Sequence, residues 1–152
     1  MTFGQAVKNN FSKYVTFSGR AARSEFWWWG LFVMVTNLVL SWVDIALFGT
    51  VETGVGRVSG YTDMPVLSSL FLLATLLPSI SVTVRRLHDR DKSGWWYWLF
   101  LVPIVGSIVL LVWFILEGTR GANSYGPDPL DPSGSGDSGE GLTSSSIPSV
   151  GR

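Results

Sequence analysis

The sequence predicts an all-α membrane protein with an N-terminal amphipathic interfacial helix, three transmembrane helices and a disordered C-terminal tail. The main observation is three long apolar stretches, at residues 26–48, 66–84 and 95–116, with short polar segments between them. As helices they would be roughly 34, 28 and 33 Å long, against a hydrocarbon core of about 30 Å. The composition agrees, because 47% of the residues are hydrophobic and only 14% are charged.

The N-terminal segment, residues 1–25, contains a second kind of pattern. Apolar and aromatic residues recur there at steps of three or four: Phe3, Val7, Phe11 and Tyr14. This spacing predicts a helix over residues 2–15 with one apolar face, flanked by Lys8 and Lys13. We expect it to lie on the cytoplasmic membrane surface with its lysines near anionic headgroups. A helix packed on the rest of the protein is the alternative, because both share this pattern.

Basic residues near the ends of the spans predict the orientation of the membrane domain, residues 26–128. With three spans, one side carries Lys8, Lys13, Arg20, Arg23, Arg85, Arg86, Arg90 and Lys92. The other side has only Arg57 and Arg120 near the membrane. We therefore expect a cytoplasmic N-terminus, an external loop over residues 49–65 and an external C-terminus. The tail, residues 129–152, is rich in Gly, Ser, Pro and Asp, a composition typical of disorder.

Polar residues within the first span share one helical face. This face carries Asn37, Ser41 and Asp44 and is expected to pack on a polar stripe of the second span, since interhelical hydrogen bonds stabilise membrane bundles. Asp44 has two interpretations. It could form an ion or proton site with the other two residues, or it could be a carboxylate at the external interface. The second interpretation is favoured, because a charged side chain costs less free energy near the end of a span than at its centre.

Two charged segments are predicted to meet at the cytoplasmic face. Arg20, Arg23 and Glu25 precede the first span, and Arg85, Arg86, His88 and Asp89 follow the second. If the two helices are antiparallel neighbours, Glu25 can pair with Arg85 or Arg86. Asp89 can likewise pair with Arg20 or Arg23. Partly buried pairs of this kind would fix the register of the helices.

The sequence offers little for catalysis or cofactor binding. His88 is the only histidine and there is no cysteine, so a metal site is not expected. His88 could transfer protons with Asp89, but a structural role is favoured. No nucleophile elbow, phosphate-binding glycine loop or His-Glu-x-x-His motif occurs. We expect no enzymatic activity, no cofactor and no nucleic-acid partner.

Three motifs together carry a family resemblance. They are Gly-Arg-x-x-Arg-x-Glu-Phe-Trp at residues 19–27, Arg-Arg-Leu-His-Asp at 85–89 followed by Ser-Gly-Trp-Trp at 93–96, and Asn123, Tyr125, Gly126 and Pro129. Over residues 3–129 the chain resembles the bacterial inner-membrane proteins of domain-of-unknown-function family 805. The resemblance implies a membrane protein of three or four helices in the cytoplasmic (inner) membrane. It implies no activity, cofactor or catalytic residue.

These observations favour a non-enzymatic scaffold or subunit that binds a partner or lipid. A cation-rich cytoplasmic rim would attract anionic headgroups. The alternative is an oligomeric transport or channel component in which Asn37, Ser41 and Asp44 line the path, because three helices alone are too few to enclose one. A third class, a lipid enzyme, would need Arg85, Arg86, His88 and Asp89 around a headgroup. A homo-oligomer and a membrane-protein partner both remain open.

Overall fold

The computed structural model describes residues 1–54, 57–62 and 64–131, and it is mostly helical. Its elements are α1 (Phe3–Ser12), α2 (Arg23–Phe48), β1 (Thr50–Gly54), β2 (Arg57–Tyr61), α3 (Val66–Asp89), the 3₁₀ helix η1 (Gly94–Leu101) and α4 (Val105–Ile115). From residue 132 onward, the segment predicted to be a disordered tail lies outside the described residues.

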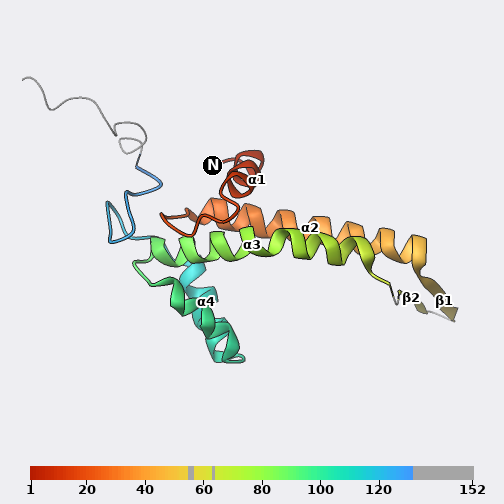
Figure 1. Cartoon of the computed structure of the whole chain (residues 1–152). Coiled ribbons are helices and arrows are strands. Elements are labelled where there is room, and N and C mark those ends of the chain that lie inside the picture. The colour runs from red at the N-terminus through yellow and green to blue at the C-terminus, as the bar shows by residue number, and fades with distance from the viewer. Residues whose placement is uncertain (55–56, 63, 132–152) are drawn as a thin grey trace, which may run out of the picture.

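Helices α2 and α3 form a long antiparallel pair that organises the molecule (Figure 1). Trp29 of α2 is buried against Val82 of α3, and its indole Nε1 donates a hydrogen bond to Ser79 Oγ at 3.0 Å. Both helices are long and apolar enough to cross a membrane. Much of their outer surface is exposed Leu, Val and Trp, such as Trp42 and Leu73. Lipid would solvate such a surface better than water.

The bounds of both helices extend into the charged motifs. Helix α2 begins at Arg23, and α3 continues to Asp89. The prediction that residues 85–89 follow the second helix was therefore wrong. They form its last turn instead, which places their side chains at helical spacing.

Residues 49–65, expected as an external loop, contain an antiparallel hairpin. Strand β1 pairs with β2, and Thr50 lies opposite Tyr61. The hairpin joins α2 to α3 at the end of the pair far from the charged motifs (Figure 1).

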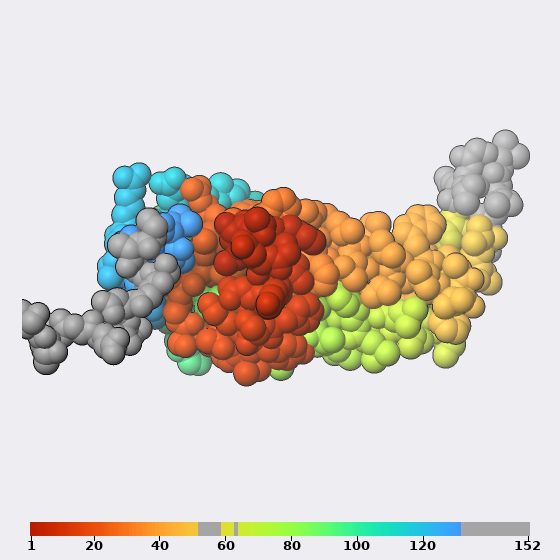
Figure 2. Space-filling model, turned by 90° about the horizontal axis from the view of Figure 1, so that it is seen from above, coloured from red at the N-terminus to blue at the C-terminus, as the bar shows by residue number. Residues whose placement is uncertain are grey.

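Helix α1 packs across one side of the pair, nearer the charged end (Figure 2). Phe11 makes edge-on contacts with Trp29 and Phe32, at centroid distances of 5.2 and 6.0 Å. Ala6 and Asn10, on the inner face of α1, are fully buried. The apolar face predicted for α1 thus contacts protein, although Phe3 and Phe11 also remain 43% exposed.

The predicted third span, residues 95–116, is not one helix. Pro103 and Ile104 divide it, and Ile104 has φ +65° and ψ −69° with a Val105 N–H to Pro103 carbonyl hydrogen bond of 2.7 Å. This is a tight γ-turn that a β-branched residue rarely adopts. The 11 residues of α4 would span only about 16 Å, too short to cross a bilayer.

Instead, η1 and α4 form an apolar hairpin that projects from the charged end of the pair and returns to it (Figure 1). Leu87 of α3 is buried with Leu110 and Phe114 of α4 at the base of this hairpin. The chain after α4 therefore lies at the same end as the N-terminal segment. The expectation that the two lie on opposite sides was wrong, because the third apolar stretch turns back.

Candidate functional site

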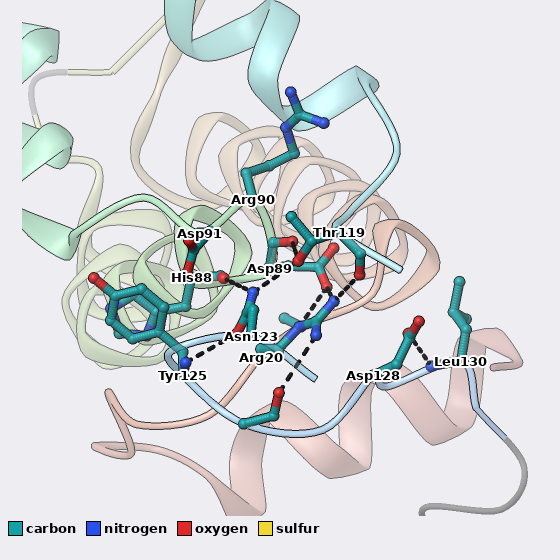
Figure 3. Close-up of polar contacts among 12 residues, drawn as sticks. Arg20, His88, Asp89, Arg90, Asp91, Thr119, Asn123, Tyr125, Asp128 and Leu130 are labelled. Atoms are coloured by element: carbon teal, nitrogen blue, oxygen red, sulfur yellow. Dashed lines mark hydrogen bonds and ion pairs between the residues drawn. The ribbon is translucent and has the colours of Figure 1, made fainter. Parts of the chain in front are cut away.

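The charged end of the helix pair, called the polar end here, joins three segments that are far apart in sequence. These are residues 13–25, the last turn of α3 with the following turn (residues 85–94), and the C-terminal segment, residues 117–131. Figure 3 shows the contacts among them.

Asp89 lies at the centre of the polar end and pairs with two arginines. Its Oδ1 accepts hydrogen bonds from Arg20 Nε at 3.0 Å and Arg20 Nη2 at 2.9 Å. Its Oδ2 accepts from Arg86 Nη1. Because all three side chains are almost fully buried, this cluster is held in a medium where ion pairs are strong and unpaired charges are costly.

Arg20 also holds the C-terminal segment in place. Its Nη1 donates to the Gly121 carbonyl at 2.6 Å, and its Nη2 donates to the Thr119 carbonyl. The Thr119 amide in turn donates to the Asp89 carbonyl at 2.8 Å. The planar guanidinium suits this role, because its donors point in fixed directions toward several acceptors.

Arg86 connects the same centre to the end of the apolar hairpin. Its Nη2 donates to the carbonyls of Phe114, at 3.3 Å, and Leu116. Carbonyls at a helix C-terminus lack intrahelical partners and carry partial negative charge, so a buried cation stabilises them. Burial lowers the pKa of Arg86, and the charge of Asp89 opposes this shift, so Asp89 stabilises the charged guanidinium inside the protein.

A second buried pair links α1 to the helix pair. Arg85 Nη1 donates to Glu25 Oε1 at 2.7 Å, and Arg85 Nη2 donates to Asn10 Oδ1 at 3.0 Å. The Asn10 amide completes its bonding with the Ala6 carbonyl at 2.9 Å. Asn10 was missed by sequence reasoning. The sequence did contain a signal for it, because Asn10 is a polar residue that lies between Val7 and Tyr14 at a helical position that faces inward.

His88 is held between the loop before α2 and the C-terminal segment. Its Nδ1 lies 3.1 Å from the Gly19 carbonyl, and its ring stacks on Tyr125 with centroids 3.9 Å apart and planes 6° apart. A carbonyl only accepts, so Nδ1 carries the proton and Nε2 is left as an acceptor. His88 lies beyond the apolar stretch 66–84. Burial lowers its pKa, an effect that the Gly19 bond opposes.

An open cavity of about 420 Å³ lies beside the buried cluster. Arg86 and Asp89 form its floor, and exposed charged residues of both signs surround it. Glu117 bridges Arg23 at 3.0 Å and Arg120 at 3.8 Å. Arg120 is 93% exposed, so its pairing is weak.

The structure gives the three predicted intramembrane residues different roles, although Asp44 and Asn37 both bond to Ser68. Asp44 is buried and its two oxygens accept from the Leu67 amide at 2.9 Å, the Ser68 amide at 2.9 Å and Ser68 Oγ at 2.7 Å. It thus caps the N-terminus of α3, where backbone amides lack helical partners. Asn37 donates to the Ser68 carbonyl at 3.2 Å. Ser41 and Asn37 line an open groove of about 400 Å³ whose lining does not include Asp44.

The structure brings most of the predicted cytoplasmic residues together and selects between the pairings left open. Glu25 pairs with Arg85, and Asp89 pairs with Arg20. Arg23 stays outside the buried cluster, on the cavity rim. Across residues 1–54, 57–62 and 64–131, no group of three or more His, Asp or Glu side chains is placed to hold a metal ion.

Comparison with known proteins identifies the family. The chain matches the family described as Protein of unknown function (DUF805) over residues 14–127. The chain belongs to the DUF805 family. It is 44% identical over 116 residues to the inner membrane protein YhaI of Escherichia coli K12, covering 76% of this chain and 87% of that protein. It is 38% identical over 120 residues to the inner membrane protein YhaH of the same strain, covering 78% and 92%.

The DUF805 match includes most of the polar end, but not the α1 residue that bonds to Arg85. It contains Arg20, Asp89 and Tyr125, whereas Asn10 precedes it. A third relative, the uncharacterized protein YiiR of Escherichia coli K12, is 29% identical over 143 residues, covering 76% of this chain and 87% of that protein. No solved structure matches the chain. The family and its relatives place the chain among bacterial inner-membrane proteins of unknown function.

Proposed function

We propose that this DUF805 protein is a non-enzymatic scaffold of the inner membrane that presents its polar end to a partner protein. The observation that carries the proposal is the use of the buried charges. Arg20, Arg86 and Asp89 bind one another and the backbone of the C-terminal segment. They therefore build a fixed surface.

The same observation argues against a lipid enzyme. A headgroup site made by Arg85, Arg86 and Asp89 would require their donors and acceptors to face a substrate. Glu25, Asn10 and backbone carbonyls occupy these donors instead. Breaking such pairs to admit a substrate would leave buried charges unpaired, at a cost of about 3–5 kcal/mol.

We place the polar end in the cytoplasm. It contains eight basic residues, and α1 beside it adds Lys8; the eight are Lys13, Arg20, Arg23, Arg85, Arg86, Arg90, Lys92 and Arg120. Arg57 lies in β2 at the other end of the pair. Basic residues are retained on the cytoplasmic side of bacterial membranes, so this asymmetry supports a cytoplasmic N-terminus and a multi-pass topology of two complete spans with an inserted hairpin.

Site-specific photocrosslinking in native membranes tests the scaffold proposal. A photoreactive residue at Arg120, on the cavity rim, is expected to give a discrete protein adduct, because the Arg120 side chain is 93% exposed. The matched control is the same residue at Trp42, which is 66% exposed on the lipid-facing surface of α2. Discrete adducts at Trp42 only, with none at Arg120, would contradict a partner at the polar end.

Anionic headgroups are a second proposed contact of the rim. An exposed arginine near a membrane surface contributes about 1 kcal/mol of attraction to anionic lipid, or roughly a fivefold preference. We expect spin-labelled phosphatidylglycerol to associate more with the wild-type protein than with Arg23→Gln/Arg120→Gln, and the difference to shrink in high salt. Equal association with both proteins would remove this contact.

A transport role has less support. The alternative placed Asn37, Ser41 and Asp44 along one path, but Asp44 accepts hydrogen bonds from the amides of α3 and does not line the groove that the other two line. A liposome flux assay distinguishes the two functions. Reproducible flux that Asp44→Asn abolishes, in a protein that stays folded, would favour transport over the scaffold.

A further inference from the structure

A groove on the far side of α3 from α2 is separate from the charged rim of the 420 Å³ cavity, which is formed by Arg23, Glu117 and Arg120. It has a volume of about 640 Å³ and lies between α3, η1 and the loop before α2. Along α3 its lining runs from Ile80 and Val84 to His88, and Ser93 lines it just beyond the end of this helix. The groove therefore changes from apolar to polar where α3 leaves the apolar stretch 66–84, as an amphiphile does where its chain meets its headgroup.

The polar part of this groove offers an acceptor. His88 is only 9% exposed. Its Nδ1 donates a hydrogen bond to the Gly19 carbonyl, and Tyr125 covers one face of its ring. A Cβ built on Gly94 would lie 3.6 Å from His88 Nε2, so this atom sits beside a residue that lines the groove. The unprotonated Nε2 accepts a hydrogen bond and does not donate one.

The remaining lining favours a cation over an anion. None of the described residues that line this groove is Lys, Arg, Asp or Glu. Aromatic rings surround it instead, including Phe17, Trp95 and Trp98, and Trp95 is 78% exposed. Aromatic faces attract ammonium groups, and tryptophan attracts them most strongly. A phosphate alone would find no charged donor here.

We propose that this groove binds one molecule of phosphatidylethanolamine, with its primary ammonium group donating to His88 Nε2 among the aromatic rings. One acyl chain then lies along Ile80 and Val84. A primary ammonium meets both requirements, because it is a cation and a hydrogen-bond donor. The trimethylammonium of phosphatidylcholine is a cation without a donor, and the glycerol of phosphatidylglycerol is a donor without a cation.

Native mass spectrometry of the full chain with the three lipids, matched in acyl chains and supplied at equal concentration, tests the site. We expect one bound phosphatidylethanolamine, retained about fivefold more than phosphatidylcholine, the ratio that one hydrogen bond of about 1 kcal/mol gives. His88→Phe keeps a ring to stack on Tyr125 and removes the acceptor, so this preference is expected to disappear.

Ile80→Trp provides an independent variant, because it fills the apolar part without touching the polar end. It is expected to lower retention of phosphatidylethanolamine at least about fivefold. Leu73→Trp is its control, since Leu73 is on the same helix, 67% exposed and outside the groove. Equal retention of the three lipids by the wild type, no retained lipid, or equal retention by the two tryptophan variants would each overturn the site. The charged rim is unchanged in all these variants, so the outcome is independent of the scaffold proposal.

Discussion

At the scale of single residues, Asp89 is the anion on which the polar end depends. It contacts two guanidinium groups, from Arg20 and Arg86, which are themselves buried. Carbonyls of the C-terminal segment and of α4 accept further hydrogen bonds from the Nη atoms of the two arginines and spread the excess positive charge. Such a cluster tolerates burial only while each charged group keeps its partners.

Asp89→Asn is expected to lower the free energy of unfolding by about 3–5 kcal/mol, because two buried arginines lose their counter-charge. Asp91→Asn is the matched control. Asp91 is exposed and has φ +55°, a conformation that asparagine also adopts, so a change within about 0.5 kcal/mol is expected. Thermal unfolding in detergent measures both. Similar melting temperatures for the two variants would contradict the central role of Asp89.

His88 gives a prediction for pH. Burial lowers its pKa, so the unfolded chain binds a proton at a higher pH than the folded chain does. The stability that depends on His88 is therefore complete above about pH 6.5 and is lost as the pH falls through the lowered pKa. The melting temperature is expected to fall less between pH 7 and pH 5 in His88→Gln than in the wild type. Parallel pH profiles would show that His88 titrates normally.

At the scale of elements, the turn between η1 and α4 decides the architecture. Gly106 lies where the hairpin closes, and a Cβ built there would lie 1.9 Å from the Leu99 carbonyl oxygen. The close approach of the two backbones thus requires glycine at this position. Pro103 removes a backbone donor at the same turn, which stops η1 from continuing as a helix.

Gly106→Ala is expected to destabilise the protein strongly or open the hairpin, because alanine at this position collides with backbone. Gly30→Ala is the control, since nothing lies within 4 Å of a Cβ on Gly30. That change is expected to be neutral or to stabilise α2 by up to about 1 kcal/mol. Thermal unfolding and limited proteolysis of the two variants provide the comparison. An unchanged Gly106→Ala protein would argue against the hairpin.

The elements also show how far the sequence predicts this fold. Apolar length predicted α2 and α3 because each is a continuous helix, and opposite charges predicted that Glu25 and Asp89 would pair across them. Length could not separate a spanning helix from a hairpin over residues 95–116, because both are apolar throughout. Pro103 and Gly106 were visible, but a proline is also tolerated as a kink in a membrane helix.

Hydropathy could not predict which residues distant in sequence would contact one another at the polar end. The acceptors of Arg20 and Arg86 are backbone carbonyls, which every residue carries and no sequence pattern marks. Asp44 was similarly ambiguous, because a carboxylate that caps a neighbouring helix and one that binds an ion look alike in a sequence.

At the scale of the whole molecule, the hairpin determines which segments share an end of the helix pair. Helices α2 and α3 are each long and apolar enough to cross a membrane, and the third apolar segment returns to the end of the pair where it began, so Arg20 and the C-terminal segment meet. The topology is therefore inseparable from the polar end. If the third segment crossed, the bonds from Arg20 to Thr119 and Gly121 could not form.

The chain has no cysteine, so single introduced cysteines report its topology without interference. Ser18, Ser124 and Ser59 are exposed; the first two lie at the polar end, and Ser59 lies in β2. With a membrane-impermeant maleimide on intact spheroplasts, Ser59→Cys is expected to be labelled, whereas Ser18→Cys and Ser124→Cys are labelled only after permeabilisation. Labelling of Ser124→Cys together with Ser59→Cys, while Ser18→Cys stays protected, would show that the third segment crosses the membrane and would contradict the account.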